Sequence, residues 1–162
     1  GEEPRVLSGR EATYTAGKDT GRYWDAGAAN VHWVVSTDGQ VGQGFAEALG
    51  RVRAPGVLVE GNSFLKHAGA DFTVMVARPD RAQLKPTARW ALRKTSALYL
   101  SQFRDELEPE AVRILLDELK SAGDLGKTPQ TFPVYTRQTL PQLSAEIRAS
   151  LAFKSTHAPQ AV

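Results

Sequence analysis

Residues 71–101, DFTVMVARPDRAQLKPTARWALRKTSALYLS, decide the fold class that the sequence predicts. Residues 72–77 and 97–101 are continuous apolar runs, which are typical of strands buried on both faces. Residues 86–95 predict a helix between them, because Pro86 stands at a first-turn position where its missing N–H costs nothing. A strand, a helix and a second strand in this order predict a right-handed crossover between two parallel strands.

The same alternation continues on both sides of this stretch. Apolar runs predict further strands at residues 31–36, 56–61 and 132–136, and helical patterns occur at 20–28, 44–52, 109–122 and 140–153. The helix at 109–122 is the clearest: its apolar stripe comprises Val112, Leu115, Leu116 and Leu119, and Gly123 supplies a left-handed stop. We therefore expect a single α/β domain over residues 1–153, with three αβα layers and a mostly parallel sheet, and a flexible tail over 154–162.

The last helix, residues 140–153, has its own start signal. Thr139 and Gln142 have the spacing of a capping box, and Leu143, Ile147 and Leu151 line one face.

Composition excludes several classes of protein. The 162 residues include no cysteine, so neither a disulfide framework nor a thiolate metal site can form. No apolar run approaches the roughly 20 residues that span a bilayer, and the first ten residues are not a signal peptide. We therefore expect a cytoplasmic protein without a membrane partner. A net charge of +2 does not by itself indicate nucleic acid.

Basic residues are concentrated in one part of the chain. Four of them recur at four-residue steps and would share one helix face: Arg81, Lys85, Arg89 and Arg93. Such a face can bind phosphates or an acidic partner. It can equally be a solvated face that pairs with the acidic residues at 105–118, and this second interpretation is favoured. Nucleic-acid binding is the least favoured use, because aromatic residues are not interleaved with the basic ones.

No catalytic constellation can be assigned from the sequence. The three histidines, at positions 32, 67 and 157, have no metal-ligand spacing. Neither a Ser-His-Asp arrangement nor a G-x-S-x-G elbow is present.

Residues 16–20, AGKDT, are similar to the end of a Walker A loop, G-x-x-x-x-G-K-[ST]. The first glycine of that motif is replaced by Ala12, and the hydroxyl residue by Asp19, whose carboxylate would repel phosphates. A second near-match at 121–128 begins with serine and is followed by Pro129, where a helix should begin. Neither segment is a Walker A loop.

Two other positions carry chemistry in such a fold. Four polar residues crowd the start of a predicted helix: Lys18, Asp19, Thr20 and Arg22. The helix start with its two cations suits an anion, or else it forms a solvated cap with Asp19 as the N-cap residue. Glu60 stands at the predicted end of a buried strand and is followed by Gly61. There it would act as a Mg²⁺ or water-orienting acid, or else cap the next turn. Both pairs of alternatives remain open.

The segment AGKDTGRYWDAGAANVHWVVS (16–36) resembles a stretch of the molybdopterin-guanine dinucleotide biosynthesis protein B family. That stretch reads G-K-D-S-x-R-x-x-x-A-G-A and precedes an apolar strand; it is matched by Gly17, Lys18, Asp19, Thr20, Arg22, Ala26, Gly27 and Ala28. GVLVEGNS (56–63) is similar to the family's V-x-V-E-G segment, and the strand at 71–77 follows at a suitable spacing. The resemblance covers residues 8–77. In the rest of the chain, only the order of the predicted helices and strands is similar.

The resemblance implies a P-loop NTPase-like fold that binds GTP or ATP with Mg²⁺. It also implies an accessory role beside the guanylyltransferase of molybdenum cofactor maturation, and at most slow hydrolysis. It places five residues near the nucleotide phosphates: Lys18, Asp19, Thr20, Arg22 and Gly61. Glu60 would be the acid at a Walker B-like strand end and, with Asp19, a candidate Mg²⁺ ligand through water. A molybdenum cofactor biosynthesis protein and a second copy of the chain are the implied partners.

The sequence also departs from that family. Its Walker A loop lies upstream of the G-K-D segment, whereas residues 1–15 here are polar-rich and predict no strand. Either that unit lies outside the given sequence or it has been lost. Asn62 and Ser63 replace the family's aromatic residue and lysine. Residues 83–101 are similar to a K-P-[ST]-A-R helix in uncharacterised P-loop relatives. The alternative is a non-catalytic module that has lost nucleotide binding and docks an acidic partner on the basic face at 81–93.

Overall fold

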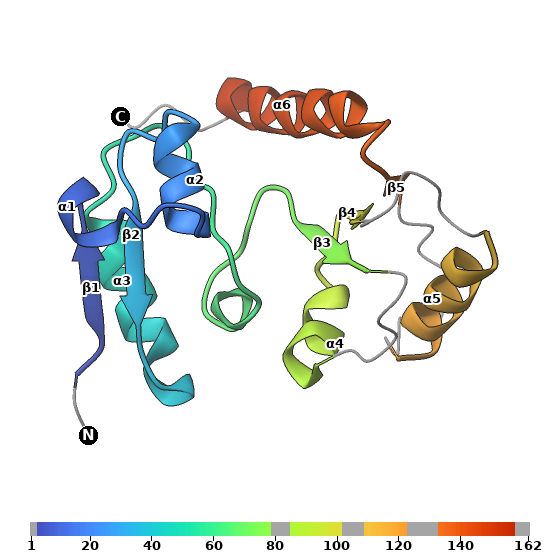
Figure 1. The fold of residues 1–162 in the computed structure, drawn as a ribbon, viewed down its shortest axis with the longest axis horizontal. Helices are drawn as coiled ribbons and strands as arrows, with labels where there is room; N and C mark the ends of the chain where they lie inside the picture. Colours follow the sequence, from blue (N-terminus) through green and yellow to red (C-terminus); the bar gives the residue numbers. More distant parts are fainter. Residues whose placement is uncertain (1–2, 79–84, 102–108, 123–132, 158–162) are drawn as a thin grey trace. The chain divides into compact units, whose positions relative to one another are not determined.

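The computed structural model describes residues 3–78, 85–101, 109–122 and 133–157. The chain divides into two compact units, Gly1–Ala68 and Gly69–Val162, whose elements are labelled in Figure 1. Each unit has its own sheet. The single domain expected over residues 1–153 stays a prediction.

The first unit contains a two-stranded antiparallel sheet. Strand β1, Arg5–Ser8, pairs with β2, His32–Val35, so that Arg5 lies opposite Val35 and Ser8 opposite His32. The strand predicted at 31–36 is confirmed as β2, but its parallel pairing is wrong. The expectation of no strand before residue 16 is also wrong. Val6 and Leu7 are too short an apolar run to be recognised, and only pairing with β2 makes them a strand.

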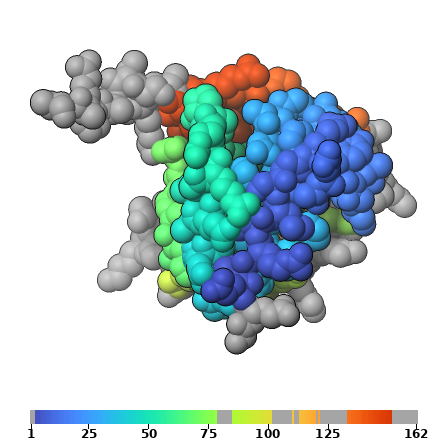
Figure 2. Space-filling model, turned by 90° about the vertical axis from the view of Figure 1, so that its left-hand side faces the viewer, coloured from blue at the N-terminus to red at the C-terminus, as the bar shows by residue number. Residues whose placement is uncertain are grey.

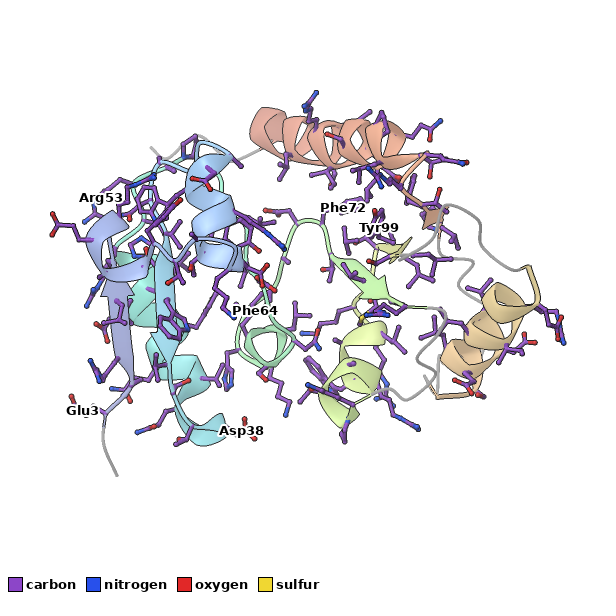
Figure 3. The ribbon with its side chains drawn as sticks, in the orientation of Figure 1. Glu3, Asp38, Arg53, Phe64, Phe72 and Tyr99 are labelled. Atoms are coloured by element: carbon purple, nitrogen blue, oxygen red, sulfur yellow. The ribbon has the colours of Figure 1, made fainter. Side chains whose placement is uncertain are left out.

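The other elements of this unit are short helices. They are α1 (Arg10–Thr13), α2 (Asp19–Asp25), the 3₁₀ turn η1 (Asp38–Gln40), α3 (Val41–Gly50) and the 3₁₀ turn η2 (Ser63–Lys66). Helix α3 packs on one face of the sheet, where Gly44 allows close contact with Val34 and Pro4. Phe45 of α3 stacks on Phe64 of η2, labelled in Figure 3, with ring centroids 5.2 Å apart. The helices predicted at 20–28 and 44–52 correspond to α2 and α3.

The strand predicted at 56–61 is wrong. Residues 56–60 have no regular secondary structure, and Val57 and Leu58 are 50% and 79% exposed. Figure 2 shows this part of the chain, in turquoise, on the surface beside the blue N-terminal residues. A run of apolar residues becomes a buried strand only where a neighbouring strand pairs with it, and no described strand pairs with this segment.

The second unit contains a parallel sheet of order β3-β4-β5. Its elements are β3 (Val74–Ala77), α4 (Pro86–Leu92), β4 (Ala97–Leu100), α5 (Pro109–Ala122), β5 (Val134–Tyr135) and α6 (Leu140–His157). Val74 pairs with Ala97, and Leu98 pairs with Val134. The strand-helix-strand prediction for 71–101 is confirmed, and α6 extends beyond its predicted end at 153. Position 123, the predicted helix stop, lies outside the described residues.

Apolar burial holds the second unit together. Among its described residues, the largest fully buried side chains are Leu92 of α4, Leu98 and Leu100 of β4, and Leu115 and Leu119 of α5. The predicted stripe of α5 therefore faces the core through Leu115 and Leu119. In α6, Leu143 is buried but Leu151 is 44% exposed, so the predicted apolar face is covered only in part. The second unit is α/β, with helices that connect parallel strands.

The start of α6 differs from the predicted capping box. The Oγ1 of Thr139 accepts a hydrogen bond of 2.8 Å from the backbone N–H of Thr136, and Thr139 offers its own carbonyl to the N–H of Gln142 at 3.1 Å. The side chain thus stabilises the turn before the helix.

Among the helices of the described residues, none is both long and apolar enough to span a bilayer.

Candidate functional site

Helix α2 is defined by a glycine at each end. Gly17 has φ of +75°, which lets the chain turn into the helix, and Lys18 is the N-cap residue in extended conformation. After the C-cap Ala26, Gly27 adopts φ of +90°. The N–H groups of Gly27 and Ala28 donate to the carbonyls of Trp24 and Tyr23, at 3.0 Å each, which is a Schellman stop. These glycines of the G-K-D and A-G-A motifs therefore set the two ends of one helix.

The first turn of α2 carries the predicted cationic cluster. Lys18 and Arg22 are exposed and Thr20 is half-buried. Asp19 is the first helical residue rather than the N-cap, so that interpretation is wrong by one position. Its carboxylate accepts a hydrogen bond of 3.2 Å from Nη1 of Arg22, one turn further along. Since both side chains are more than half exposed, the pair contributes little to stability.

Glu60 contacts this helix, although the strand predicted at 56–61 is not formed. The hydroxyl of Tyr23 donates a hydrogen bond of 2.7 Å to Oε2 of Glu60, across 37 residues of sequence. The next residue, Gly61, has φ of +129°, where a side chain would be strained. The structure therefore brings Glu60 to α2.

The electrostatics of Tyr23 reflect two nearby carboxylates. Burial, the hydrogen bond to Glu60 and the negative charges of Glu60 and Asp19 raise the pKa of Tyr23 to about 12. Each of these effects disfavours the phenolate, so Tyr23 is a neutral donor at physiological pH. Asp19 and Glu60, which come from separate segments, both act on the same phenol.

The two carboxylates suit one kind of cation. Within the described residues, no group of three or more His, Asp or Glu side chains is arranged to hold a metal ion. One or two carboxylates are instead the usual protein contribution to Mg²⁺ that is also bound by substrate phosphates. The donor set of Asp19 and Glu60 therefore fits a phosphate-bound Mg²⁺ better than an all-protein metal site.

The predicted basic face belongs to the second unit. Lys85 is the N-cap of α4, Arg89 lies in its last turn and Arg93 is its C-cap; all three are exposed. Arg81 lies outside the described residues. The neighbouring Lys94 places its ammonium 4.9 Å from the ring centre of Trp90. Three of the four predicted cations therefore share an exposed helix surface.

No sequence motif marks Tyr23 as a site residue. The available signal was its spacing: Tyr23 follows Asp19 by four residues, which places both on one side of a helix. Its partner Glu60 could not be assigned from the sequence because the intervening chain returns through an irregular segment.

The first unit contains a second polar network, at positions that no sequence motif marks. The hydroxyl of Ser8 lies 2.8 Å from Nδ1 of His32, its cross-strand partner. Nη1 of Arg51, just after α3, donates to the Ser8 hydroxyl at 3.1 Å and to the Val6 carbonyl at 2.9 Å, and Nη2 pairs with Glu47. This network ties the end of α3 to the edge of the sheet.

No protein-family model, curated protein or solved structure matches this chain. The described residues define a protein with one unit built on a two-stranded antiparallel sheet and one parallel α/β unit.

Proposed function

We propose that this chain binds a nucleotide with Mg²⁺ at the first turn of α2, in the manner implied by its resemblance to the protein B family. The supporting observation is the hydrogen bond between Tyr23 and Glu60. It connects the two segments on which the resemblance rests, G-K-D-T-x-R and V-E-G, although the strand expected for the second is absent. Contact between the two segments in the fold supports a shared site more strongly than their order along the sequence does.

The side chains at this surface have complementary roles toward a phosphate. Lys18 and Arg22 supply positive charge, and Arg22 additionally has the planar guanidinium that suits phosphate oxygens. The half-buried hydroxyl of Thr20 adds a donor at the same turn. Glu60 and Asp19 would hold the Mg²⁺, which supplies charge compensation for the phosphates when it is bound. GTP or ATP is the ligand class, and hydrolysis would be slow because no catalytic arginine is assigned.

The wider assignment belongs to the same proposal. A three-layer P-loop NTPase-like fold, a cytoplasmic location and an accessory role in molybdenum cofactor guanylylation follow from the resemblance. The partners would be a cofactor biosynthesis protein and a second copy of the chain.

Equilibrium binding of GTP and ATP in the presence of Mg²⁺ tests the proposal. We expect Lys18→Ala and Arg22→Ala each to weaken binding by about tenfold, as for the loss of a charged hydrogen bond. Arg53→Ala is the matched control, because Arg53 is exposed in the same unit and donates only locally, to the carbonyls of Gly50 and Val52 at 2.9 Å. Absence of binding up to millimolar nucleotide, by this chain and by one extended at its N-terminus, would refute the proposal.

A second candidate function uses the basic face of α4. The exposure of Lys85, Arg89 and Arg93 along one short helix favours a docking surface for an acidic partner. Retention on immobilised polyglutamate at moderate salt tests it. Joint charge reversal of Arg89 and Arg93 should abolish retention, whereas Glu60→Gln should leave it unchanged. The opposite pattern, in which Glu60→Gln weakens binding and the charge reversal does not, favours the nucleotide site.

A further inference from the structure

The hydroxyl of Ser8 stands at a turn that leads from a strand directly into a helix. Ser8 is the last residue of β1, Gly9 follows with φ of +87°, and α1 begins at Arg10. The N–H of Gly9 donates a hydrogen bond of 3.2 Å to the side-chain Oδ1 of Asn30, which holds this turn in place. A sharp strand-to-helix turn is also where α/β hydrolases present their nucleophilic serine. Ser8 therefore has the backbone setting of a reactive serine, although its neighbours do not match G-x-S-x-G.

His32 is placed to act as a base for this hydroxyl. Oγ of Ser8 lies 2.8 Å from Nδ1 of His32, a distance at which a general base can take a proton. The two residues are 24 positions apart and meet because the pairing of β1 with β2 sets them opposite each other. Both side chains are half-buried, so neither is sealed from solvent. Among the described residues, the His32 side chain makes no other hydrogen bond, so the arrangement is a dyad without the carboxylate of a triad.

Arg51 determines where the proton of the hydroxyl lies. Its Nη1 donates to the same Oγ at 3.1 Å, and a guanidinium has donors only. If Nδ1 of His32 also donated, the Ser8 hydroxyl would accept twice and its own proton would have no partner among the described residues. With the imidazole proton on Nε2, the hydroxyl accepts from Arg51 and donates to Nδ1, so that both its lone pair and its proton are used. The network thus favours the tautomer in which His32 can receive the proton of Ser8.

The positive charge of Arg51 also favours reaction at this oxygen. A cation at hydrogen-bond distance stabilises the negative charge that develops on Oγ as its proton leaves. The guanidinium is held there by two further contacts, since Nη1 also donates 2.9 Å to the Val6 carbonyl and Nη2 pairs with Glu47. Glu47 offsets part of the positive charge but fixes the guanidinium beside the serine.

We propose that Ser8 and His32 are a nucleophile–base pair that accepts an acyl group from a small activated carboxylic ester. Oγ of Ser8 attacks the carbonyl carbon and forms a new C–O bond, while its proton passes to Nδ1 of His32. The bond from the carbonyl carbon to the leaving group then breaks, and the leaving oxygen takes the proton from the imidazolium. Water repeats these steps on the acyl-serine, which releases the carboxylic acid and restores Ser8. The pair shares no residue with the proposed nucleotide site, so its failure would leave nucleotide binding untouched.

Incubation of the chain with p-nitrophenyl acetate tests the proposal. Peptide mass spectrometry locates the acetyl group, and absorbance follows the release of p-nitrophenolate. The variants are Ser8→Ala, His32→Gln and Arg51→Ala, each checked for folding by thermal melting. Because the acetyl group is first located in the unchanged chain, the test does not depend on the folding of any variant.

Each variant has a matched control in the same unit. Ser36→Ala replaces a half-buried serine that directly follows β2 and whose hydroxyl has no hydrogen-bond partner among the described residues. His67→Gln replaces an exposed histidine whose ring makes no hydrogen bond to a described serine. Arg53→Ala replaces an arginine that donates only to nearby carbonyls.

We expect the acetyl group on Ser8 and not on Ser36. His32→Gln should slow the acetylation of Ser8 by about a hundredfold, the lower end of the range for general-base catalysis, and Arg51→Ala should slow it by about tenfold. Ser8→Ala should remove the same share of p-nitrophenolate release. The three control variants should react as the unchanged chain does.

Three results would overturn the inference. Ser8 could stay unmodified, it could be acetylated no faster than Ser36, or it could react equally fast in the His32→Gln variant. Acetyl groups confined to lysines or to His32 itself count with the first result, because they show surface reactivity without a serine nucleophile.

Discussion

The backbone of Gly21 lies so close to Thr15 that a β-carbon at position 21 would be 2.2 Å from the Thr15 carbonyl oxygen. The contact joins the middle of α2 to the turn that precedes it. Because the opposing atom belongs to the backbone, it cannot swing away as a side chain could. Glycine at this position of the G-K-D-T-x-R segment is thus required by packing.

Gly21→Ala is expected to destabilise the first unit by about 1–3 kcal/mol, the usual range for overpacking, despite the higher helix propensity of alanine. Urea unfolding measures the change. Gly50→Ala is the matched control, since Gly50 ends α3 and a β-carbon there would meet open space. A Gly21→Ala variant as stable as the Gly50→Ala variant would contradict the packing argument.

Gly44→Ala and Gly42→Ala should differ although both lie in α3. A β-carbon at Gly44 would be 2.6 Å from Cγ1 of Val34, inside the interface with the sheet, so we expect a loss of about 1–3 kcal/mol. At Gly42 it would be 2.7 Å from Nδ1 of His67, an exposed side chain that can rotate away. Thermal melting of the two variants distinguishes them, and a larger loss for Gly42→Ala would disprove this reasoning.

The titration of Tyr23 provides a test of its environment. Its pKa of about 12 in the folded protein lies above the ordinary value of 10.0. The protonated Tyr23 therefore contributes to the stability of the folded state in full below pH 10, and this contribution is lost as the pH rises towards 12. Absorbance at the phenolate band, with Tyr23→Phe subtracted, isolates this residue. Glu60→Gln should lower the pKa, because it removes the charge and changes the hydrogen bond. An unchanged titration in Glu60→Gln would mean that burial and Asp19, and not Glu60, raise the pKa.

Arg51→Ala should destabilise the first unit more than Arg53→Ala. The guanidinium of Arg51 donates to the Val6 carbonyl and the Ser8 hydroxyl in β1, whereas that of Arg53 donates only to carbonyls nearby in sequence. We expect a loss of about 1 kcal/mol for Arg51→Ala, typical of hydrogen bonds at a partly exposed site, and no more than about 0.5 kcal/mol for Arg53→Ala. Denaturant midpoints measure both, and equal losses would rule out a special role for Arg51.

Leu92→Ala should destabilise the protein far more than Leu58→Ala. Leu92 is 0% exposed at the end of α4, so its removal leaves a cavity and is expected to cost about 2–5 kcal/mol. Leu58→Ala is the control, because Leu58 is 79% exposed and its loss should change stability by less than about 0.5 kcal/mol. If Leu58→Ala were equally destabilising, the segment at 56–60 would have to be packed rather than exposed.

The elements that the sequence determined are those with a local signal. Pro86 and the apolar runs around it predicted β3, α4 and β4, and the stripe of Leu115 and Leu119 predicted α5, whose bounds agree with the prediction. The helical pattern at 20–28 likewise predicted α2, although the helix ends at Asp25. These signals work because helix starts, helix stops and continuous apolar strands depend on residues that are neighbours in the chain.

Tertiary structure decided the elements that depend on distant pairing. Val6 and Leu7 are a strand because β2 lies beside them, and Val57 and Leu58 are exposed because no described strand does. The hydrogen bond from Tyr23 to Glu60 crosses 37 residues, and its existence depends on where an irregular segment returns to α2. The types of residue at the candidate site could therefore be predicted from sequence, but their meeting is set by long-range packing, which local patterns do not encode.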